Sequence, residues 1–146
     1  MDPALQSLAC SIANQYGLPP EIVCGQVERE SSWETNATRY EPAFFVRYIE
    51  PMIDSGALAD MQEAKNRATS FGLLQIMGQV ARELGYDGPL ESLLIPEIGL
   101  AWGCEKLAKC LSSAGNIAAA LQRYNGGNNP NYAAEVMQNS QKYKES

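Results

Sequence analysis

The chain has 146 residues, of which 45% are hydrophobic and 19% charged, a composition typical of one folded globular domain. It carries 11 Lys and Arg against 17 Asp and Glu, a net charge of −6 with no basic run, so we expect no nucleic-acid partner. The sequence contains no His, which excludes a His-based catalytic triad and a His-liganded zinc site. Proton transfer near neutral pH must therefore use a carboxyl group or another side chain of shifted pKa.

The first 20 residues lack the basic start and apolar middle of a secretory signal, and the apolar runs of the chain are too short to cross a bilayer. We therefore expect no membrane insertion and no export directed by the chain itself. We also expect a monomer.

Apolar residues recur at helical spacing along most of the chain. A first helix is predicted to begin at Asp2-Pro3, a favourable N-cap and first-turn pair, and to end at Gly17. Pro19 and Pro20 open a second helix. Further helices are predicted at about 43–54, 57–68, 77–84, 96–112, 115–123 and 131–143. Alternation with a period of two is nearly absent, so we predict a mainly α fold with hardly any strand.

The four cysteines are Cys10, Cys24, Cys104 and Cys110, and they form no Cys-x-x-Cys pair that would indicate a zinc or redox motif. The simplest interpretation is that they are small buried apolar residues, and one or two disulfides are the alternative for a protein that works outside the cytoplasm. Cys104 and Cys110 lie in one predicted helix, about 9 Å apart along its axis, which is too far to bridge. Any disulfide would therefore join different segments.

The second predicted helix carries an acidic residue on its apolar face. Val23, Val27 and Glu30 are spaced i, i+4, i+7 and so share one face. A carboxyl group there loses hydration and lies near the negative end of the helix dipole, and both effects raise its pKa, as a general acid requires. The spacing alone also fits an ordinary ion pair of Glu30 with Arg29, Arg39 or Arg47.

Three motifs follow this helix in order. They are Glu30-Ser31-Ser32-Trp33 with Asn36-Ala37, then Gly72-Leu73-Leu74-Gln75-Ile76-Met77, then Tyr124-Asn125-Gly126-Gly127 with Tyr132 soon after. Over about residues 18–137 the chain resembles the soluble lytic transglycosylases and their goose-type lysozyme relatives. The resemblance implies a lysozyme-like, mainly α single domain of seven to eight helices around a glycan-binding cleft. It also implies cleavage of the β-1,4 bond between N-acetylmuramic acid and N-acetylglucosamine in peptidoglycan.

By the same resemblance, Glu30 matches the family's catalytic acid and base, and Ser31 the hydroxyl residue that orients this acid. Gln75 matches a sugar-contacting residue of the cleft wall, and Tyr124 and Asn125 match the aromatic and amide pair opposite. Each match also has an ordinary structural interpretation: a helix-end hydroxyl for Ser31, a solvent-facing side chain for Gln75 and a turn after a helix for Asn125.

Tyr132 matches a further Tyr that the family places near its acid. In the implied reaction, protonated Glu30 donates to the glycosidic oxygen as an oxocarbenium-like state forms. The same carboxylate then takes the proton of the muramic acid 6-hydroxyl, which attacks the anomeric carbon and leaves a 1,6-anhydro end. No metal and no organic cofactor are expected.

The chain departs from the family pattern between its first two motifs. The family joins them by a much shorter stretch, whereas 41 residues lie here between Glu30 and Gly72. The extra part, about residues 41–68, is apolar enough for one or two small helices beside the cleft. It brings in Glu41, and goose-type relatives that hydrolyse use extra downstream carboxylates to hold a water. A muramidase with Glu41 as its second carboxylate is therefore an alternative.

Two further alternatives are a non-catalytic glycan-binding module of a virion or secretion apparatus, and a helical interaction domain whose motifs match by accident. The expected partner is the glycan strand of peptidoglycan, and the expected place of action is the bacterial cell wall, in the periplasm or outside the cell. We expect that the lack of a leader in this sequence suits a phage endolysin released by a holin or a protein delivered by a secretion system, and a mature form with its leader trimmed would look identical.

Overall fold

The structure is a computed structural model that describes residues 2–144. Its first two helices, α1 (Pro3–Gln15) and α2 (Pro20–Ser31), begin where the sequence predicts. The Asp2 side chain accepts a hydrogen bond from the Ala4 amide and so caps α1. Each helix has a proline in its first turn, where a missing N–H group leaves no hydrogen bond unmade.

A small antiparallel sheet follows α2. Its strands are β1 (Thr38–Tyr40), β2 (Thr69–Phe71) and β3 (Ile76–Met77), in the order β1-β2-β3. Thr38 lies opposite Phe71 at one end of the β1–β2 pair and Tyr40 lies opposite Thr69 at the other. The sequence did not reveal this sheet because strands of two or three residues are too short to show alternation.

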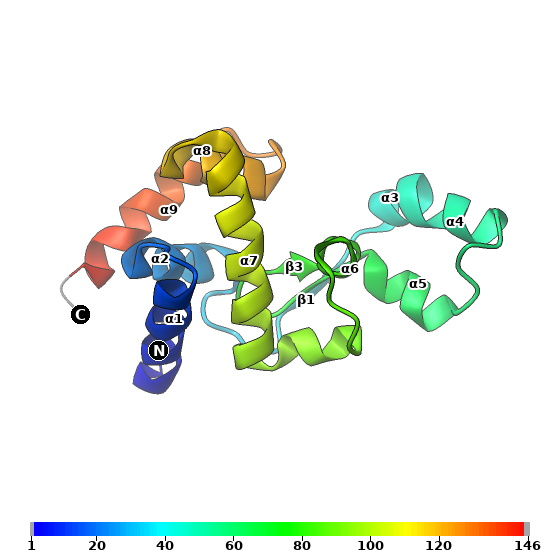
Figure 1. Cartoon of the computed structure of the whole chain (residues 1–146), viewed down its shortest axis with the longest axis horizontal. Coiled ribbons are helices and arrows are strands. Elements are labelled where there is room, and N and C mark those ends of the chain that lie inside the picture. The colour runs from blue at the N-terminus through cyan, green and yellow to red at the C-terminus, as the bar shows by residue number, and fades with distance from the viewer. Residues whose placement is uncertain (1, 145–146) are drawn as a thin grey trace.

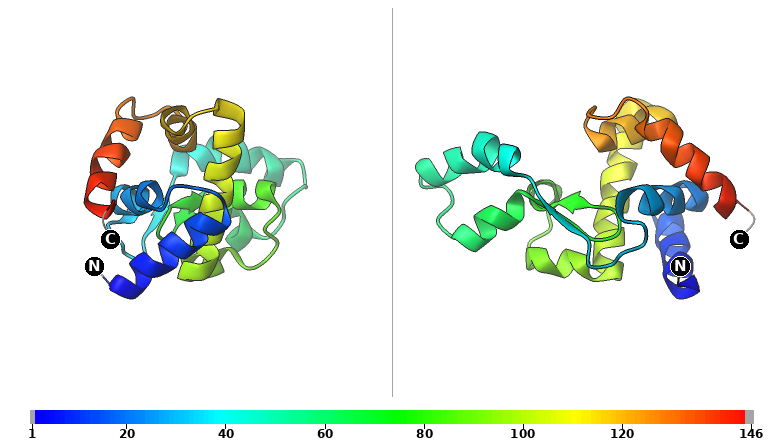
Figure 2. Two further views of the ribbon diagram at one scale, coloured as in Figure 1. Left: turned by 60° about the vertical axis from the view of Figure 1, so that its left-hand side comes forward. Right: turned by 180° about the vertical axis from the view of Figure 1, so that it is seen from behind.

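Residues 41–68 leave the end of β1 and return at the start of β2 as an arm of short helices. The arm consists of α3 (Pro42–Phe44), the π-helical segment η1 (Phe45–Ile49), α4 (Glu50–Asp54) and α5 (Met61–Arg67). Figures 1 and 2 show it projecting from the rest of the molecule. Its buried residues Ile49, Leu58, Ala64 and Ala68 form a separate small core, so the arm packs on itself as well as on the body.

The rest of the chain is helical. It comprises α6 (Gly78–Leu84), the 3-10 helix η2 (Leu90–Leu94), α7 (Pro96–Ala114), α8 (Ile117–Asn125), α9 (Tyr132–Ser140) and the 3-10 helix η3 (Gln141–Tyr143). Figure 1 shows α7 standing between α1 and α2 on one side and the sheet and arm on the other. The predicted helices are found within a few residues of their expected bounds, η2 was not predicted, and the mainly α fold is confirmed.

The main core lies around α2, which packs against α1 and α9. Val23, Cys24 and Val27 of α2 are fully buried there, together with apolar residues of α1, α7, α8 and α9. Gly25 permits the close approach of α9, because a Cβ atom at this position would lie 2.7 Å from the Val136 carbonyl oxygen. This packing brings the start of α9 beside the end of α2.

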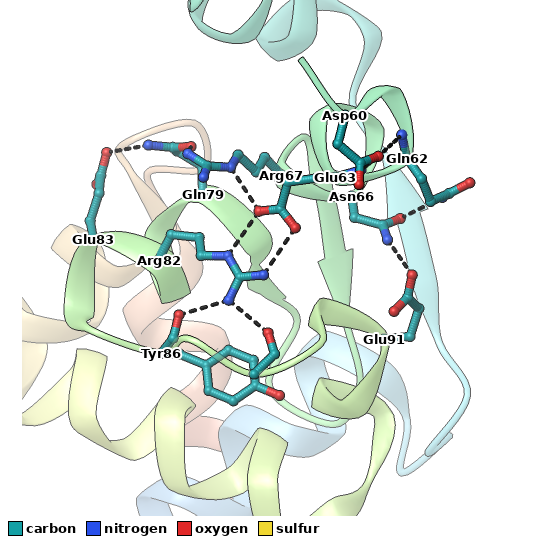
Figure 3. A network of polar contacts seen from close by, with 11 residues as sticks. Asp60, Gln62, Glu63, Asn66, Arg67, Gln79, Arg82, Glu83, Tyr86 and Glu91 are labelled. Carbon is teal, nitrogen blue, oxygen red and sulfur yellow. Dashed lines mark hydrogen bonds and ion pairs between the residues drawn. The ribbon is translucent and has the colours of Figure 1, made fainter. Parts of the chain in front are cut away.

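Figure 3 shows a polar network that ties the arm to α6. Glu63 of α5 accepts hydrogen bonds from Arg67 Nε at 2.9 Å and from Arg82 Nε and Nη2 at 2.8 and 2.9 Å. Arg82 also donates to the carbonyl oxygens of Tyr86 and Gly88. The hydrogen bonds from Arg82, together with the one from Arg67, hold the pKa of Glu63 below its usual value against the opposing effect of burial.

Glu63→Gln should therefore lower the free energy of unfolding by about 1 to 2 kcal/mol at pH 7. Because the folded state lowers the pKa of Glu63, its stabilising effect is present above the unfolded pKa and is lost as pH falls through the folded value. Denaturant unfolding at a series of pH values should show the variant and the wild type converging in the acid range. The exposed Glu34, changed to Gln, serves as control and should have little effect at any pH, and equal stability of Glu63→Gln and wild type at pH 7 would contradict the prediction.

Candidate active site

A cleft of about 680 Å³ lies at the end of α2, walled by the β2–β3 segment, α7, the end of α8 and the start of the arm. Five of the seven predicted site residues line it: Glu30, Glu41, Gln75, Tyr124 and Asn125. The other two, Ser31 and Tyr132, are not part of its lining. The structure thus brings the three sequence motifs together at one cleft.

Glu30 is the penultimate residue of α2 and is largely buried. Burial raises the pKa of its carboxyl group, while a hydrogen bond from Tyr132 and the positive charges of Lys106 and Arg29 oppose the rise. Among residues 2–144, Glu30 forms no ion pair: Arg29 is paired with Glu135, Arg39 with Glu41, and the Arg47 guanidinium lies over the Tyr48 ring. The alternative of an ordinary ion pair for Glu30 is therefore wrong.

Tyr132, the first residue of α9, stands directly behind Glu30 with 1% of its surface exposed. Its hydroxyl group donates to Glu30 Oε2 at 2.6 Å and accepts from Gln26 Nε2 at 3.1 Å. Burial, followed by the proximity of Glu30, raises the pKa of Tyr132, so this hydroxyl keeps its proton. The bond from Gln26 occupies the hydroxyl oxygen and thereby directs the hydrogen toward Glu30.

Gln26 was not predicted as a site residue. It lies one turn before Glu30 on the same buried face of α2 and is fully buried. A sequence signal existed, because a Gln among Val23 and Val27 on a core face must find a polar partner. The identity of that partner, which comes from α9 over a hundred positions later, could not be read from the spacing.

Ser31 links two of the motifs. Its single hydroxyl hydrogen is shared between the carbonyl oxygens of Val27 at 3.1 Å and Leu73 at 2.9 Å, and so joins the end of α2 to the segment before Gln75. No described contact joins it to the Glu30 carboxyl group. A direct orienting role of Ser31 on the acid stays a prediction.

Gln75 lies in the turn between β2 and β3 in the left-handed backbone conformation, with φ of 49°. This conformation is unfavourable for a residue other than Gly, and such residues are found preferentially at functional sites. Its side-chain nitrogen donates to the carbonyl oxygens of Ala37 at 3.0 Å and Gly72 at 2.9 Å. With both amide hydrogens engaged, the amide oxygen is the atom that Gln75 can offer to a ligand.

Tyr124 lines the cleft and is 4% exposed. Its hydroxyl group donates to the Leu74 carbonyl oxygen at 2.7 Å, and burial raises the pKa of this hydroxyl well above its usual value. Asn125, the last residue of α8, accepts from the Asn129 amide through Oδ1 at 2.9 Å and so shapes the loop beside the cleft. The Asn125 side-chain nitrogen is the group that can donate to a ligand.

Lys106 of α7 also lines the cleft and was not predicted. Its Nζ donates to the Tyr124 carbonyl oxygen at 2.9 Å and lies 3.9 Å from the centre of the Tyr124 ring. Burial lowers the pKa of Lys106, an effect that the nearby Cys110 and Glu30 oppose. The sequence carries no signal for this residue, because a single Lys on a long helix normally faces solvent.

Positively charged side chains outnumber negatively charged ones in the cleft, although the whole chain has a net charge of −6. Arg29, Arg39, Lys106 and Arg123 face it, against the carboxyl groups of Glu30 and Glu41. Glu41 is held by Arg39, whose Nε lies 3.0 Å from Glu41 Oε1. An enclosed carboxyl group among amides and cations suits proton transfer to a polar ligand with hydroxyl, amide or carboxylate groups.

Within residues 2–144, no group of three or more His, Cys, Asp or Glu side chains could hold a metal ion, and no helix is long and apolar enough to span a membrane.

A family model described as "Transglycosylase SLT domain" matches residues 7–146, a range that includes all three motifs and the arm. No curated protein and no solved structure gives a significant match to the chain. The family match confirms the lysozyme-like, mainly α fold that the motifs predicted. With its motifs gathered at one cleft, the chain belongs to the transglycosylase SLT domain family.

Proposed function

We propose that this protein is a lytic transglycosylase that cuts the β-1,4 bond between N-acetylmuramic acid and N-acetylglucosamine in peptidoglycan and leaves 1,6-anhydromuramic ends. The observation that carries the proposal is Glu30, a largely buried carboxyl group of raised pKa that lines the cleft of an SLT family member. Burying a carboxyl group costs stability, and a general acid needs the raised pKa that results.

The other cleft residues suit a glycan strand. The Gln75 amide oxygen can accept from a sugar hydroxyl or acetamido N–H group, and the Asn125 amide nitrogen can donate to an oxygen on the opposite side. Phe44, at the start of the arm, adds an aromatic ring to the lining, and such rings cover the apolar faces of sugars. Lys106 and Arg123 can attract carboxylates of peptides attached to the strand.

In the proposed reaction, protonated Glu30 donates its proton to the glycosidic oxygen while the bond from that oxygen to the muramic anomeric carbon breaks. The hydrogen bond from Tyr132 and the charge of Lys106 then stabilise the Glu30 carboxylate. This carboxylate takes the proton of the muramic 6-hydroxyl group, whose oxygen bonds to the anomeric carbon. Glu30 is thereby protonated again and ready for the next bond.

A muramidase is the second candidate, because Glu41 lines the same cleft as Glu30. An inverting hydrolase needs a second carboxylate about 6.5 to 9.5 Å from the acid, with a water between them. The ion pair with Arg39 occupies one oxygen of Glu41 and so favours a bracing role.

A binding module without turnover is less well supported, since a buried acid of raised pKa adds nothing to glycan binding.

The first prediction about the reaction concerns the acid. Glu30→Gln keeps the shape of the side chain but cannot donate the proton, so the rate of clearing a peptidoglycan suspension should fall about 10² to 10⁴-fold. Glu34→Gln, on the exposed turn just after α2, is the matched control and should clear at the wild-type rate. Clearing by a folded Glu30→Gln variant at a rate near that of the wild type would refute the mechanism.

The second prediction concerns pH. The Tyr132 hydroxyl group favours the ionised form of Glu30, so Tyr132→Phe should raise the pKa of Glu30 further. Activity needs protonated Glu30 and falls as pH rises through its pKa, so the alkaline limb of the rate profile should move to higher pH in the variant. Tyr124→Phe removes a buried hydroxyl group that does not contact Glu30, and it should leave the limb in place. A limb that stays in place in Tyr132→Phe, or one that moves down, would contradict the assignment.

The third prediction separates the two reactions by the mass of the products. Anhydro ends are lighter than hydrolysed reducing ends by one water, and we expect wild-type digests to contain the anhydro form. Glu41→Gln should lower the rate, because it disturbs the Arg39 pair, without changing the product. Reducing ends in the wild-type digest that disappear selectively in Glu41→Gln would instead identify a muramidase with Glu41 as its base.

A further inference from the structure

The packing of α1 on α2 brings together two cysteines from separate segments. Cys10 Sγ of α1 lies 3.7 Å from Cys24 Sγ of α2, and both are free thiols. Cys24 is fully buried, whereas Cys10 is only half-buried and can be reached from solvent. The pair therefore combines one accessible sulfur with one enclosed sulfur in van der Waals contact.

We propose that Cys10 and Cys24 are a disulfide site, which closes when the protein meets a disulfide-bearing oxidant. A disulfide needs the two sulfurs about 2.05 Å apart. Each Sγ can move by rotation about its Cα–Cβ bond, and closure requires the present Sγ–Sγ separation of 3.7 Å to shorten to this length. The sulfurs face each other across a helix pair that the folded core already holds in place.

The other two cysteines do not offer an equivalent pair. Cys104 and Cys110 lie on the same helix, six positions apart, where they cannot bridge each other. Cys104 is fully buried, and among the described residues no sulfur–sulfur contact joins it to another cysteine. Cys110 is half-buried and provides an internal control for a cysteine that is accessible to solvent.

Because Cys10 can be reached from solvent and Cys24 cannot, Cys10 reacts with the oxidant first. The Cys10 thiolate attacks one sulfur of the oxidant's disulfide, forms a mixed disulfide and releases the first thiol of the oxidant. The Cys24 thiolate then attacks the Cys10 sulfur, forms the Cys10–Cys24 bond and releases the second thiol. Two cysteine thiols are thereby oxidised, one oxidant disulfide is reduced to two thiols, and the protons pass to solvent and to the released sulfurs. Burial, with Cys10 as the next cause, raises the pKa of Cys24, so the second step should be the slower one.

The bond would fasten α1 to the helix that carries Glu30. Cys24 lies six positions before Glu30 in α2, and the closed loop runs through the turn at Gly17 and Pro19. A cross-link over a loop of this length restricts the unfolded chain, and we expect the melting temperature to rise by about 5 to 10 °C.

The test uses the full reduced chain and oxidised glutathione as the oxidant. After removal of the oxidant, remaining thiols are alkylated, and the intact mass and the protease peptides are measured. We expect a protein lighter by two hydrogen atoms before alkylation, with two alkylated cysteines, Cys104 and Cys110, and one peptide pair joined through Cys10 and Cys24. The melting temperature should rise as stated and return to the starting value with dithiothreitol.

Three variants locate the effect. Cys10→Ser should lose both the mass change and the rise in melting temperature, whereas Cys110→Ser should keep both. Cys24→Ala should stop the reaction after the first step and keep one glutathione on Cys10. Four alkylated cysteines in the oxidised wild type, a stable glutathione adduct on its Cys10, or a peptide pair joining Cys10 to Cys110 would each overturn the proposal. Because the wild-type protein alone gives these results, the outcome does not depend on the folding of a variant or on enzymatic activity.

Discussion

Keeping one carboxyl group away from water governs how the parts of this molecule are arranged. Glu30 loses hydration at the end of α2, and the folded protein must offset that loss with contacts that still leave the acid able to release its proton. A direct ion pair would hold Glu30 ionised. The structure instead supplies a neutral hydroxyl group from Tyr132 and keeps Arg29 in a pair with Glu135.

That hydroxyl group reaches Glu30 because several elements converge on α2. The absence of a side chain at Gly25 lets α9 approach α2, and Tyr132 is the first residue of α9. On the other side, Ser31 joins the end of α2 to the carbonyl oxygen of Leu73, and the left-handed turn at Gln75 follows. The acid, its hydrogen-bond donor and the cleft wall are therefore positioned by backbone packing around one short helix.

Much of this arrangement could be predicted from the sequence, and the parts that could not share a physical cause. The helix of Glu30 and its buried face follow from local spacing, so they were predictable from a few neighbouring residues. The partner of Gln26 and the burial of Lys106 depend on contacts between distant segments, which periodicity does not encode. The resemblance to a family placed Tyr132 near the acid, but only the structure shows its hydroxyl group directed at Glu30.

The register of the small sheet determines how the arm is connected to the rest of the chain. Tyr40 and Thr69 are directly opposite each other in the β1–β2 pair, so the arm departs and returns at neighbouring points. Residues 41–68 thus occupy the place of a hairpin loop. A change in their number would leave the pairing of β1 with β2 unchanged. A chimera could exchange the arm for a tight turn or for a foreign helical module, and Gln75 and Glu30 would keep their backbone supports. The contributions of Glu41 and Phe44 to the cleft and the hydrogen bonds of Glu63 to Arg82 of α6 would leave with the exchanged segment.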